Sequence, residues 1–218
     1  VYQSVIERER NLGYGGKCVE VVPHIPLEVK DRIEKAVERT KAEIMIIEIG
    51  GTVGEYQNML FLETARMMKL TYGHDAVFVM VSYLPVPSNS SEMKTKPTQY
   101  AIRTLNAAGI QPDFIIARSS VALDLPRRQK IAVNCNISAE DVIAAPDSPS
   151  IYEVPVNFEK DDLGNRILAK FRLKPRKKDL VDWRAMIGRI KNAKKAIDIG
   201  IVGKYFLSGD FNVTDSYI

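Results

Sequence analysis

The sequence predicts an α/β protein, in which a mostly parallel β-sheet is flanked by helices. Short apolar runs rich in β-branched residues alternate with longer stretches of helical period, which is typical of a sheet covered by helices. Of the 218 residues, 45% are hydrophobic. A chain of this size and composition buries a substantial core, and intrinsic disorder is excluded. No window reaches the roughly 18 uninterrupted apolar residues of a membrane-spanning helix, so we expect no membrane partner.

Compact apolar runs bounded by polar or turn residues mark the expected strands, and such continuous apolar runs predict strands that are buried on both faces. They are residues 18–22, 44–49, 76–83, 114–117 and 142–145. Helical period marks the segments between them. The expected helices are residues 27–40, 55–71, 98–108 and 126–135, with Gly73 and Gly109 as carboxyl-terminal stops and Pro126 at a helix start.

After residue 157 the pattern changes to helices over residues 161–171 and 179–193, separated by a polar run at 174–178. Residues 197–202 then predict the first strand of a new α/β unit, which places a domain boundary near residue 195. The chain begins with Val1 and stops at Ile218 inside this pattern. We therefore expect a part of a longer polypeptide.

The net charge of +4 is unevenly distributed, because thirteen Lys or Arg and only four Asp lie between Lys160 and Lys195. A solvated helical linker explains such a stretch. No recognition motif accompanies it, so we expect no nucleic-acid partner.

Cys18 and Cys135 are too few for a disulfide framework, which favours a cytoplasmic location. Neither His24 nor His74 has metal-ligand or triad spacing.

The first candidate site is residues 48–54, where Glu48 ends an apolar strand and three glycines follow before a helix. Ligands of open α/β sheets bind at this edge, and glycines let backbone N–H groups approach an anion. Glu48 could hold Mg²⁺, which prefers carboxylate and phosphate oxygens. The alternative interpretation is a tight strand-to-helix turn with a surface glutamate.

Two further segments are expected at the same edge. Residues 94–99 carry two lysines among hydroxyl and amide side chains, which suits a polyphosphate, and a helix start adds backbone donors. The alternative for this segment is a mobile polar loop. Arg118 follows the strand at 114–117, and Arg127 through Lys130 open the next helix. Lys130 suits a phosphate or a base, although a basic residue on an amphipathic helix is more often only solvated.

Taken together, residues 48–54, 94–99, 109–113 and 150–152 closely resemble the CTP synthase family in order and spacing. The resemblance also includes residues 22–26 and 200–205, and it covers nearly the whole chain. It implies a P-loop, dethiobiotin-synthetase-like synthetase domain at residues 1–157, a helical linker at 158–195, and the start of a class I glutaminase domain at 196–218.

The family phosphorylates O4 of UTP with ATP, and ammonia from glutamine displaces the phosphate to give CTP. The resemblance implies Mg²⁺ as cofactor, ATP as co-substrate, GTP as allosteric activator and a homotetramer. Glu48 matches the Mg²⁺-binding glutamate, and Lys96 is the catalytic candidate that stabilises negative charge near the reacting end. The implied UTP and CTP contacts are Glu55, Tyr56, Gln57, Lys94, Thr95, Lys96, Pro97, Thr98, Gln99 and Lys130. The implied ATP contacts are Pro146, Asp147 and Ser148.

The chain departs from the family pattern in three respects. Glu55, Tyr56 and Gln57 stand where many members have Asp-Ile-Glu, a segment associated with feedback binding of CTP. The family's P-loop and second metal-binding Asp lie before this segment, and its glutaminase Cys, His and Glu lie after it. We therefore expect these residues alone to be inactive. Two alternatives are another ATP-dependent amidoligase of this fold and a non-catalytic nucleotide-binding or assembly module.

Overall fold

The computed structural model describes residues 1–89, 92–176 and 179–200. It divides into two compact units, Val1–Asp179 and Leu180–Ile218. The described part of the second unit contains helix α8 (Val181–Lys191). Among the described residues, no helix is both long enough and apolar enough to cross a bilayer.

The first unit is built around a parallel sheet in the order β1 (Val79–Tyr83), β2 (Phe114–Ser119) and β3 (Val142–Pro146). The described helices of this unit are α1 (Tyr2–Arg10), α2 (Val21–Thr40), α3 (Met59–Tyr72), α4 (Lys96–Ala107), α5 (Leu125–Cys135), α6 (Val154–Phe158) and α7 (Leu163–Lys170). Short 3₁₀ turns lie at Tyr56–Asn58, Gly73–Asp75, Ala139–Asp141, Ile151–Glu153 and Glu159–Asp161. The predicted α/β class is confirmed.

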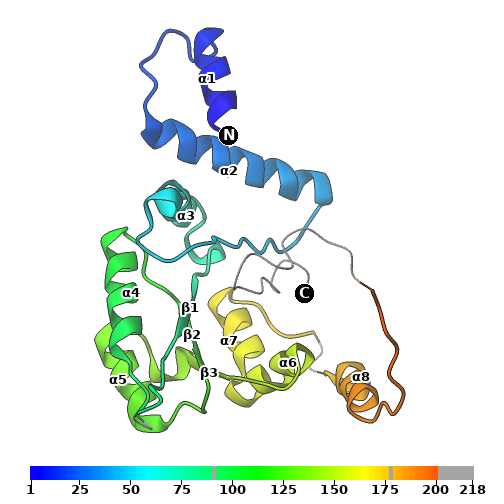
Figure 1. Ribbon diagram of the computed structural model, residues 1–218. Coiled ribbons are helices and arrows are strands. Elements are labelled where there is room, and N and C mark those ends of the chain that lie inside the picture. Colours follow the sequence, from blue (N-terminus) through cyan, green and yellow to red (C-terminus); the bar gives the residue numbers. More distant parts are fainter. Residues whose placement is uncertain (90–91, 177–178, 201–218) are drawn as a thin grey trace. The chain divides into compact units, whose positions relative to one another are not determined.

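Strand β2 is the centre of the core because its side chains alternate between the two faces of the sheet. Ile115 and Ala117 pack with residues of α4 and α5 on one face, whereas Phe114 and Ile116 pack with residues of α6 and α7 on the other. Figure 1 shows α4 and α5 on one side of the sheet and α6 and α7 on the opposite side. Both faces of β2 are therefore buried, as its continuous apolar run predicts.

Strand β1 differs from β2, because its alternate residues Val79, Val81 and Tyr83 are exposed. The register pairs Val79 with Phe114 and Val81 with Ile116, so these side chains belong to the α6 and α7 face. The prediction that this strand is buried on both faces was wrong in that respect. Within the described residues, the helices of that face pack on β2 and β3.

Two predicted strands are absent from the described residues. Residues 18–20 form no strand, and Val21 and Val22 instead begin α2. Val22 is extended there (φ −112°, ψ 123°), as expected for a residue before proline, but it pairs with no strand. Residues 44–49 also form no strand, although their composition is that of one, because no described strand lies beside them. Ile46 is 90% exposed.

The helix predictions were more successful. The predicted helices at 27–40, 55–71, 98–108, 126–135, 161–171 and 179–193 correspond to α2, α3, α4, α5, α7 and α8. Gly73 and Gly109 follow α3 and α4 with positive φ, which confirms their role as stops. The strand predicted at 197–202 extends beyond the described residues, and 197–200 carry no strand.

Candidate functional site

The segment that follows Glu48 is held by its own polar side chains. The backbone N–H of Thr52 donates to the Glu55 carboxylate (2.9 Å), and Gln57 Nε2 donates to the second oxygen of that carboxylate (2.6 Å). Hydrogen bonds from Thr52 and Gln57 hold the pKa of Glu55 below its ordinary value. Glu55 and Gln57, two of the predicted pyrimidine-nucleotide contacts, are therefore hydrogen-bonded to each other.

Asn58 completes this arrangement from the start of α3. Its Nδ2 donates to the carbonyls of Thr52 (2.8 Å) and Gly50 (3.4 Å), and the residue is 4% exposed. Its Oδ1 is buried without a partner among the described residues. Asn58 was not among the site residues predicted from the sequence. The signal was present, since Asn58 directly precedes the apolar run of residues 59–62 that begins α3.

Glycine is required where this segment approaches α4. Gly54 has a φ of 100°, and a Cβ there would lie 3.2 Å from Cγ2 of Thr104. Val53 packs beside Leu105, so the segment rests on the carboxyl half of α4. Because α4 rises about 1.5 Å per residue, Thr104 lies about 12 Å along its axis from Lys96.

At the other end of α4, residues 94–99 form its start. Thr95 and Gln99 are buried, and Gln99 Nε2 donates to the Thr95 hydroxyl (3.1 Å). Thr98 is fully buried, with its hydroxyl 2.8 Å from that of Ser82 in β1. These bonds fix the first turn of α4 against the sheet. Lys96 and Pro97 are exposed at the same turn.

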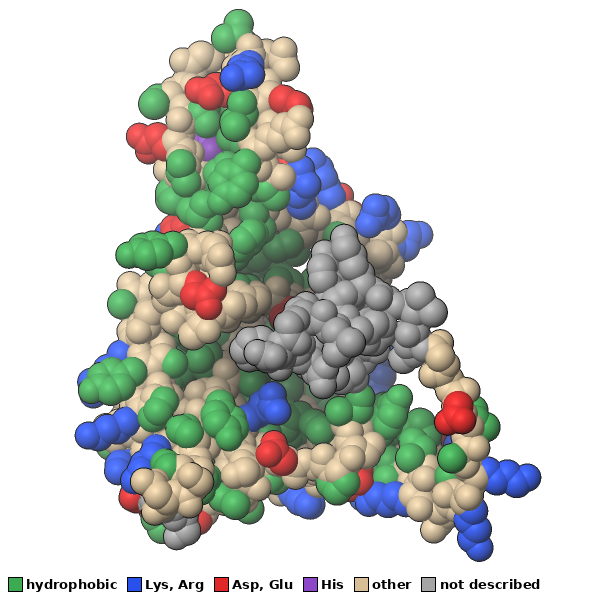
Figure 2. Space-filling view, viewed as in Figure 1, with side chains coloured by type: hydrophobic (Ala, Val, Ile, Leu, Met, Phe, Trp, Pro, Cys, Tyr) green, Lys and Arg blue, Asp and Glu red, His purple; other side chains and the backbone are tan. Residues whose placement is uncertain are grey.

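Basic side chains from two elements converge near this turn. Lys94 Nζ lies 2.5 Å from a carboxylate oxygen of Glu92. That hydrogen bond holds the pKa of Glu92 below its ordinary value, and the charges of Arg127 and Lys130 from α5 lower it further. Figure 2 shows Lys and Arg side chains gathered over the ends of α4 and α5. In this positive cluster of Lys94, Arg127 and Lys130, Lys94 pairs with Glu92 and Arg127 pairs with Asp124. The net positive charge that remains suits an anionic ligand.

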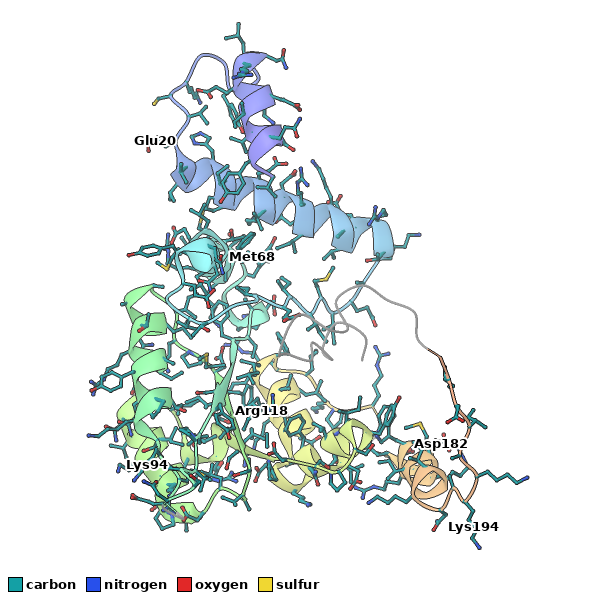
Figure 3. The ribbon with its side chains drawn as sticks, viewed as in Figure 1. Glu20, Met68, Lys94, Arg118, Asp182 and Lys194 are labelled. Carbon is teal, nitrogen blue, oxygen red and sulfur yellow. The ribbon has the colours of Figure 1, made fainter. Side chains whose placement is uncertain are left out.

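The ends of the strands lie next to this cluster. Figure 3 shows Lys94 by the start of α4 and Arg118 on β2. The carbonyl of Arg118 accepts from Leu84 N (2.7 Å), and the carbonyl of Ser119 accepts from Asp147 N (2.9 Å). Residues 146–148 are therefore attached to the end of β2, at the carboxyl edge of the sheet where ligands of such sheets bind.

A cavity of about 1370 Å³ lies on another side of the same unit. Glu48, Gly50, Gln57 and Asn58 line it, together with apolar residues of α2 and α3. No group of three or more His, Cys, Asp or Glu close enough to hold a metal is present in the described ranges. The exposed Glu48 nevertheless fits Mg²⁺, which proteins often hold by one or two carboxylates while water and phosphate oxygens complete its coordination.

The structure thus brings together Lys94, Lys130 and the segment at 146–148 near the carboxyl edge of the sheet. It does not bring Glu48 there. Residues 44–49 are not a strand, so Glu48 does not end one, and the glycine segment lies along the far half of α4. The expectation of one shared edge for Glu48 and residues 94–99 was wrong for the described residues, because that expectation required a strand at 44–49.

Comparisons with known proteins identify the family of these residues. A family model described as the CTP synthase N-terminus matches residues 1–173. The chain is 42% identical over 219 residues to CTP synthase of Methanococcus maripaludis, and 42% identical over 219 residues to CTP synthase of Pyrococcus furiosus. Each match covers 100% of this chain and 40% of the relative.

CTP synthase of a Picosynechococcus species is 41% identical over 211 residues, which cover 96% of this chain and 38% of the relative. The chain therefore spans about two fifths of the length of the curated relatives that it matches. With the family model matching most of the chain, these residues belong to the CTP synthase family.

Proposed function

We propose that the complete protein, meaning the whole polypeptide in which these residues occur, aminates UTP to CTP with ATP and with ammonia from glutamine. The observation that carries this proposal is the 42% identity to a CTP synthase over the whole chain. The positive cluster of Lys94, Arg127 and Lys130 supports it, since a nucleoside triphosphate carries the complementary charge.

In this proposal the UTP and CTP contacts form two groups on this chain, the positive cluster by the start of α4 and the segment after Glu48 along its far half. The proposed contacts are Glu55, Tyr56, Gln57, Lys94, Thr95, Lys96, Pro97, Thr98, Gln99 and Lys130. The buried Thr95, Thr98 and Gln99 shape the first turn of α4, whereas Lys94, Lys96 and Lys130 supply charge. Replacement of the family's Asp-Ile-Glu by Glu55, Tyr56 and Gln57 leaves one carboxylate here, so we expect weaker feedback binding of CTP.

Lys96 is the proposed catalytic residue. Its ammonium group is exposed at the start of α4 and has no ion-pair partner among the described residues. A free cation beside the amino-terminal dipole of a helix stabilises negative charge that develops during phosphoryl transfer. Pro146, Asp147 and Ser148 would contact ATP, and Glu48 would hold Mg²⁺, which neutralises phosphate charge when bound.

The proposal includes GTP as activator, assembly into a homotetramer and a cytoplasmic location. Cys18 and Cys135 are both free thiols, which suits a reducing compartment. It also keeps the expected division into a synthetase domain at 1–157, a linker at 158–195 and the start of a glutaminase domain at 196–218. The P-loop and the glutaminase residues would come from the rest of the complete protein.

The test is to supply the purified complete protein with UTP, ATP, Mg²⁺ and either glutamine or ammonium, and to quantify CTP by chromatography. CTP that depends on both nucleotides supports the proposal. ATP hydrolysis with another acceptor but without UTP would indicate a different amidoligase. Binding of UTP without turnover would indicate a non-catalytic module, and either result would overturn the proposal.

A further inference from the structure

The carboxylate of Asp161 connects a helix on one face of the sheet to a strand at its edge. Both of its oxygens lie 3.0 Å from Nη2 of Arg128 in α5, and one of them accepts from the backbone N–H of Ala144 in β3 (2.8 Å). Asp161 belongs to the turn that precedes α7, on the opposite face from α5 (Figure 1). The pair of Arg128 and Asp161 therefore passes around the outer edge of β3.

This pair is well shielded from water. The side chains of Arg128 and Asp161 are 17% and 19% exposed, whereas ion pairs on the protein surface are mostly solvated. A shielded pair that also satisfies a backbone N–H is stronger than a surface pair, because little screening opposes it. At the outer edge of β3, the Asp161 carboxylate accepts the hydrogen bond from Ala144 N–H that a carbonyl of a further strand would accept in a larger sheet. It therefore satisfies this edge N–H.

Further bonds fix the position of Asp161 and of the start of β3. Arg166 donates from Nε to the Asp161 carbonyl (3.1 Å) and from Nη1 to Glu140 (3.0 Å), while Lys170 donates to Asp141 (2.8 Å). Glu140 and Asp141 belong to the turn directly before β3. The amino-terminal end of β3 is thus bound to α7, and its middle is bound to Asp161.

The bonded N–H of Ala144 lies two residues before Pro146, where the proposed ATP segment begins. Arg128 is a firm anchor, because Ile131, Ala132 and Cys135 of the same helix are buried in the core. We propose that Arg128 and Asp161 are positioning residues for ATP, which hold the middle of β3 so that residues 146–148, at and just after its carboxyl end, present one fixed surface to the nucleotide. This inference rests on the proposed function.

The experiment uses three variants of the complete protein. Asp161→Asn removes the negative charge of the pair, and Arg128→Lys keeps the positive charge without the planar guanidinium group. The double variant Arg128→Gln with Asp161→Asn leaves no unpaired buried charge, and it is used if a single variant fails to fold. Asp31→Asn is the control, since it removes an ion pair with Lys35 on α2, outside this network, whose acid is 44% exposed. Affinity for a non-hydrolysable ATP analogue, KM for ATP and UTP, and amide hydrogen exchange over residues 142–148 are measured for each.

We expect the affinity for the ATP analogue to fall about tenfold and KM for ATP to rise in proportion, with KM for UTP within about twofold of wild type. Exchange of the Ala144 amide should accelerate, and Asp31→Asn should behave as wild type. Variants with a lowered melting temperature but unchanged ATP affinity and KM would show a purely structural role and overturn the inference. Equal losses for ATP and UTP would overturn it as well.

The two proposals fail in different ways. A wild-type protein that binds the ATP analogue but makes no CTP contradicts the proposed function, and the affinity ratio between variants and wild type still decides the role of the pair. A wild-type protein that does not bind the ATP analogue contradicts both.

Discussion

The side-chain amide of Asn58 donates to the backbone carbonyl of Thr52 across 2.8 Å, and thereby joins the start of α3 to the glycine segment. The same nitrogen also reaches the carbonyl of Gly50 (3.4 Å). Because Asn58 is 4% exposed, water does not replace these bonds easily. One side chain therefore determines the path of the segment that links Glu48 to Glu55.

Replacement Asn58→Ala should lower the free energy of unfolding by about 1–3 kcal/mol, because two carbonyls lose their buried donor. Urea unfolding of both proteins measures the difference. Gln57→Ala is the matched control, since Gln57 is exposed and should change stability by less than about 0.5 kcal/mol. Equal stability of Asn58→Ala and wild type would contradict the assigned role.

Glu28 gives the α1 and α2 pair a predictable dependence on pH. The residue is 5% exposed, and its carboxylate lies 2.7 Å from Arg8 and 3.0 Å from Arg32. Burial raises its pKa, but hydrogen bonds from Arg32 and Arg8 outweigh burial, so the pKa lies below the ordinary 4.5. A carboxylate whose pKa is lowered by folding stabilises the protein above its unfolded pKa, and that stabilisation is lost as the pH falls through the folded pKa.

Glu28→Gln should therefore cost about 2 kcal/mol at pH 7, and the difference from wild type should shrink below about pH 4.5. Denaturant titrations at several pH values measure this difference. Glu38→Gln, at an exposed position of α2, serves as the control and should show no such trend. A difference that grew on acidification would have the wrong sign for this account.

The two thiols should differ strongly in reactivity. Cys135 is 1% exposed, and burial raises the pKa of its thiol to about 11, whereas Cys18 is exposed. Because the thiolate is the reactive species, a disulfide reagent at pH 8 should modify Cys18 at least about tenfold faster than Cys135. Mass spectrometry of peptides at timed intervals measures both rates. Equal rates would show that the hydrophobic core around Cys135 of α5 is open to the reagent.

Lys96→Ala in the complete protein should lower kcat for CTP formation about 100-fold, which is the size expected when one donor to developing negative charge is removed. Its melting temperature should not change, since Lys96 is exposed and has no ion-pair partner among the described residues. Lys35→Ala is the control, because its side chain is 67% exposed and lies on α2. A kcat close to that of wild type would remove Lys96 from the reaction.

Glu48→Gln should raise the Mg²⁺ concentration for half-maximal CTP formation about tenfold, because a neutral amide is a weaker ligand of a hard cation than a carboxylate. A Mg²⁺ titration at fixed ATP measures this shift. Glu43→Gln, at another exposed glutamate of the same cavity, should leave the titration unchanged. If both variants titrate as wild type does, Glu48 is not the metal ligand.

Local sequence signals predicted the helices and the central strands well. Gly73 and Gly109 end helices because they adopt positive φ, and the apolar run of β2 is buried on both faces. Strands at 18–22 and 44–49 were predicted from the same kind of run but are absent. A helix forms its hydrogen bonds internally, whereas a strand needs a neighbour, so composition alone cannot establish a strand.

In the candidate site, too, some features were predicted from the sequence and others were not. A helix start near Thr98 was predicted beside the lysines of residues 94–99, and α4 begins two residues earlier, at Lys96, with Pro97 in its first turn. The bond between Arg128 and Asp161 was not predicted, since the two residues lie 33 positions apart and Arg128 was noted only as part of a basic helix start. Contacts of this kind depend on how α5 and the turn before α7 pack around β3.

The activity proposed for the complete protein is the conversion of UTP to CTP. The most direct measurement is the formation of CTP from UTP, ATP, Mg²⁺ and ammonium, because it bypasses glutamine hydrolysis and tests the synthetase reaction alone. CTP synthase of Methanococcus maripaludis, 42% identical over 219 residues, is the positive control. We predict CTP formation that requires both UTP and ATP and is strongly reduced in Lys96→Ala. Absence of CTP under conditions in which the control enzyme produces it would contradict the account.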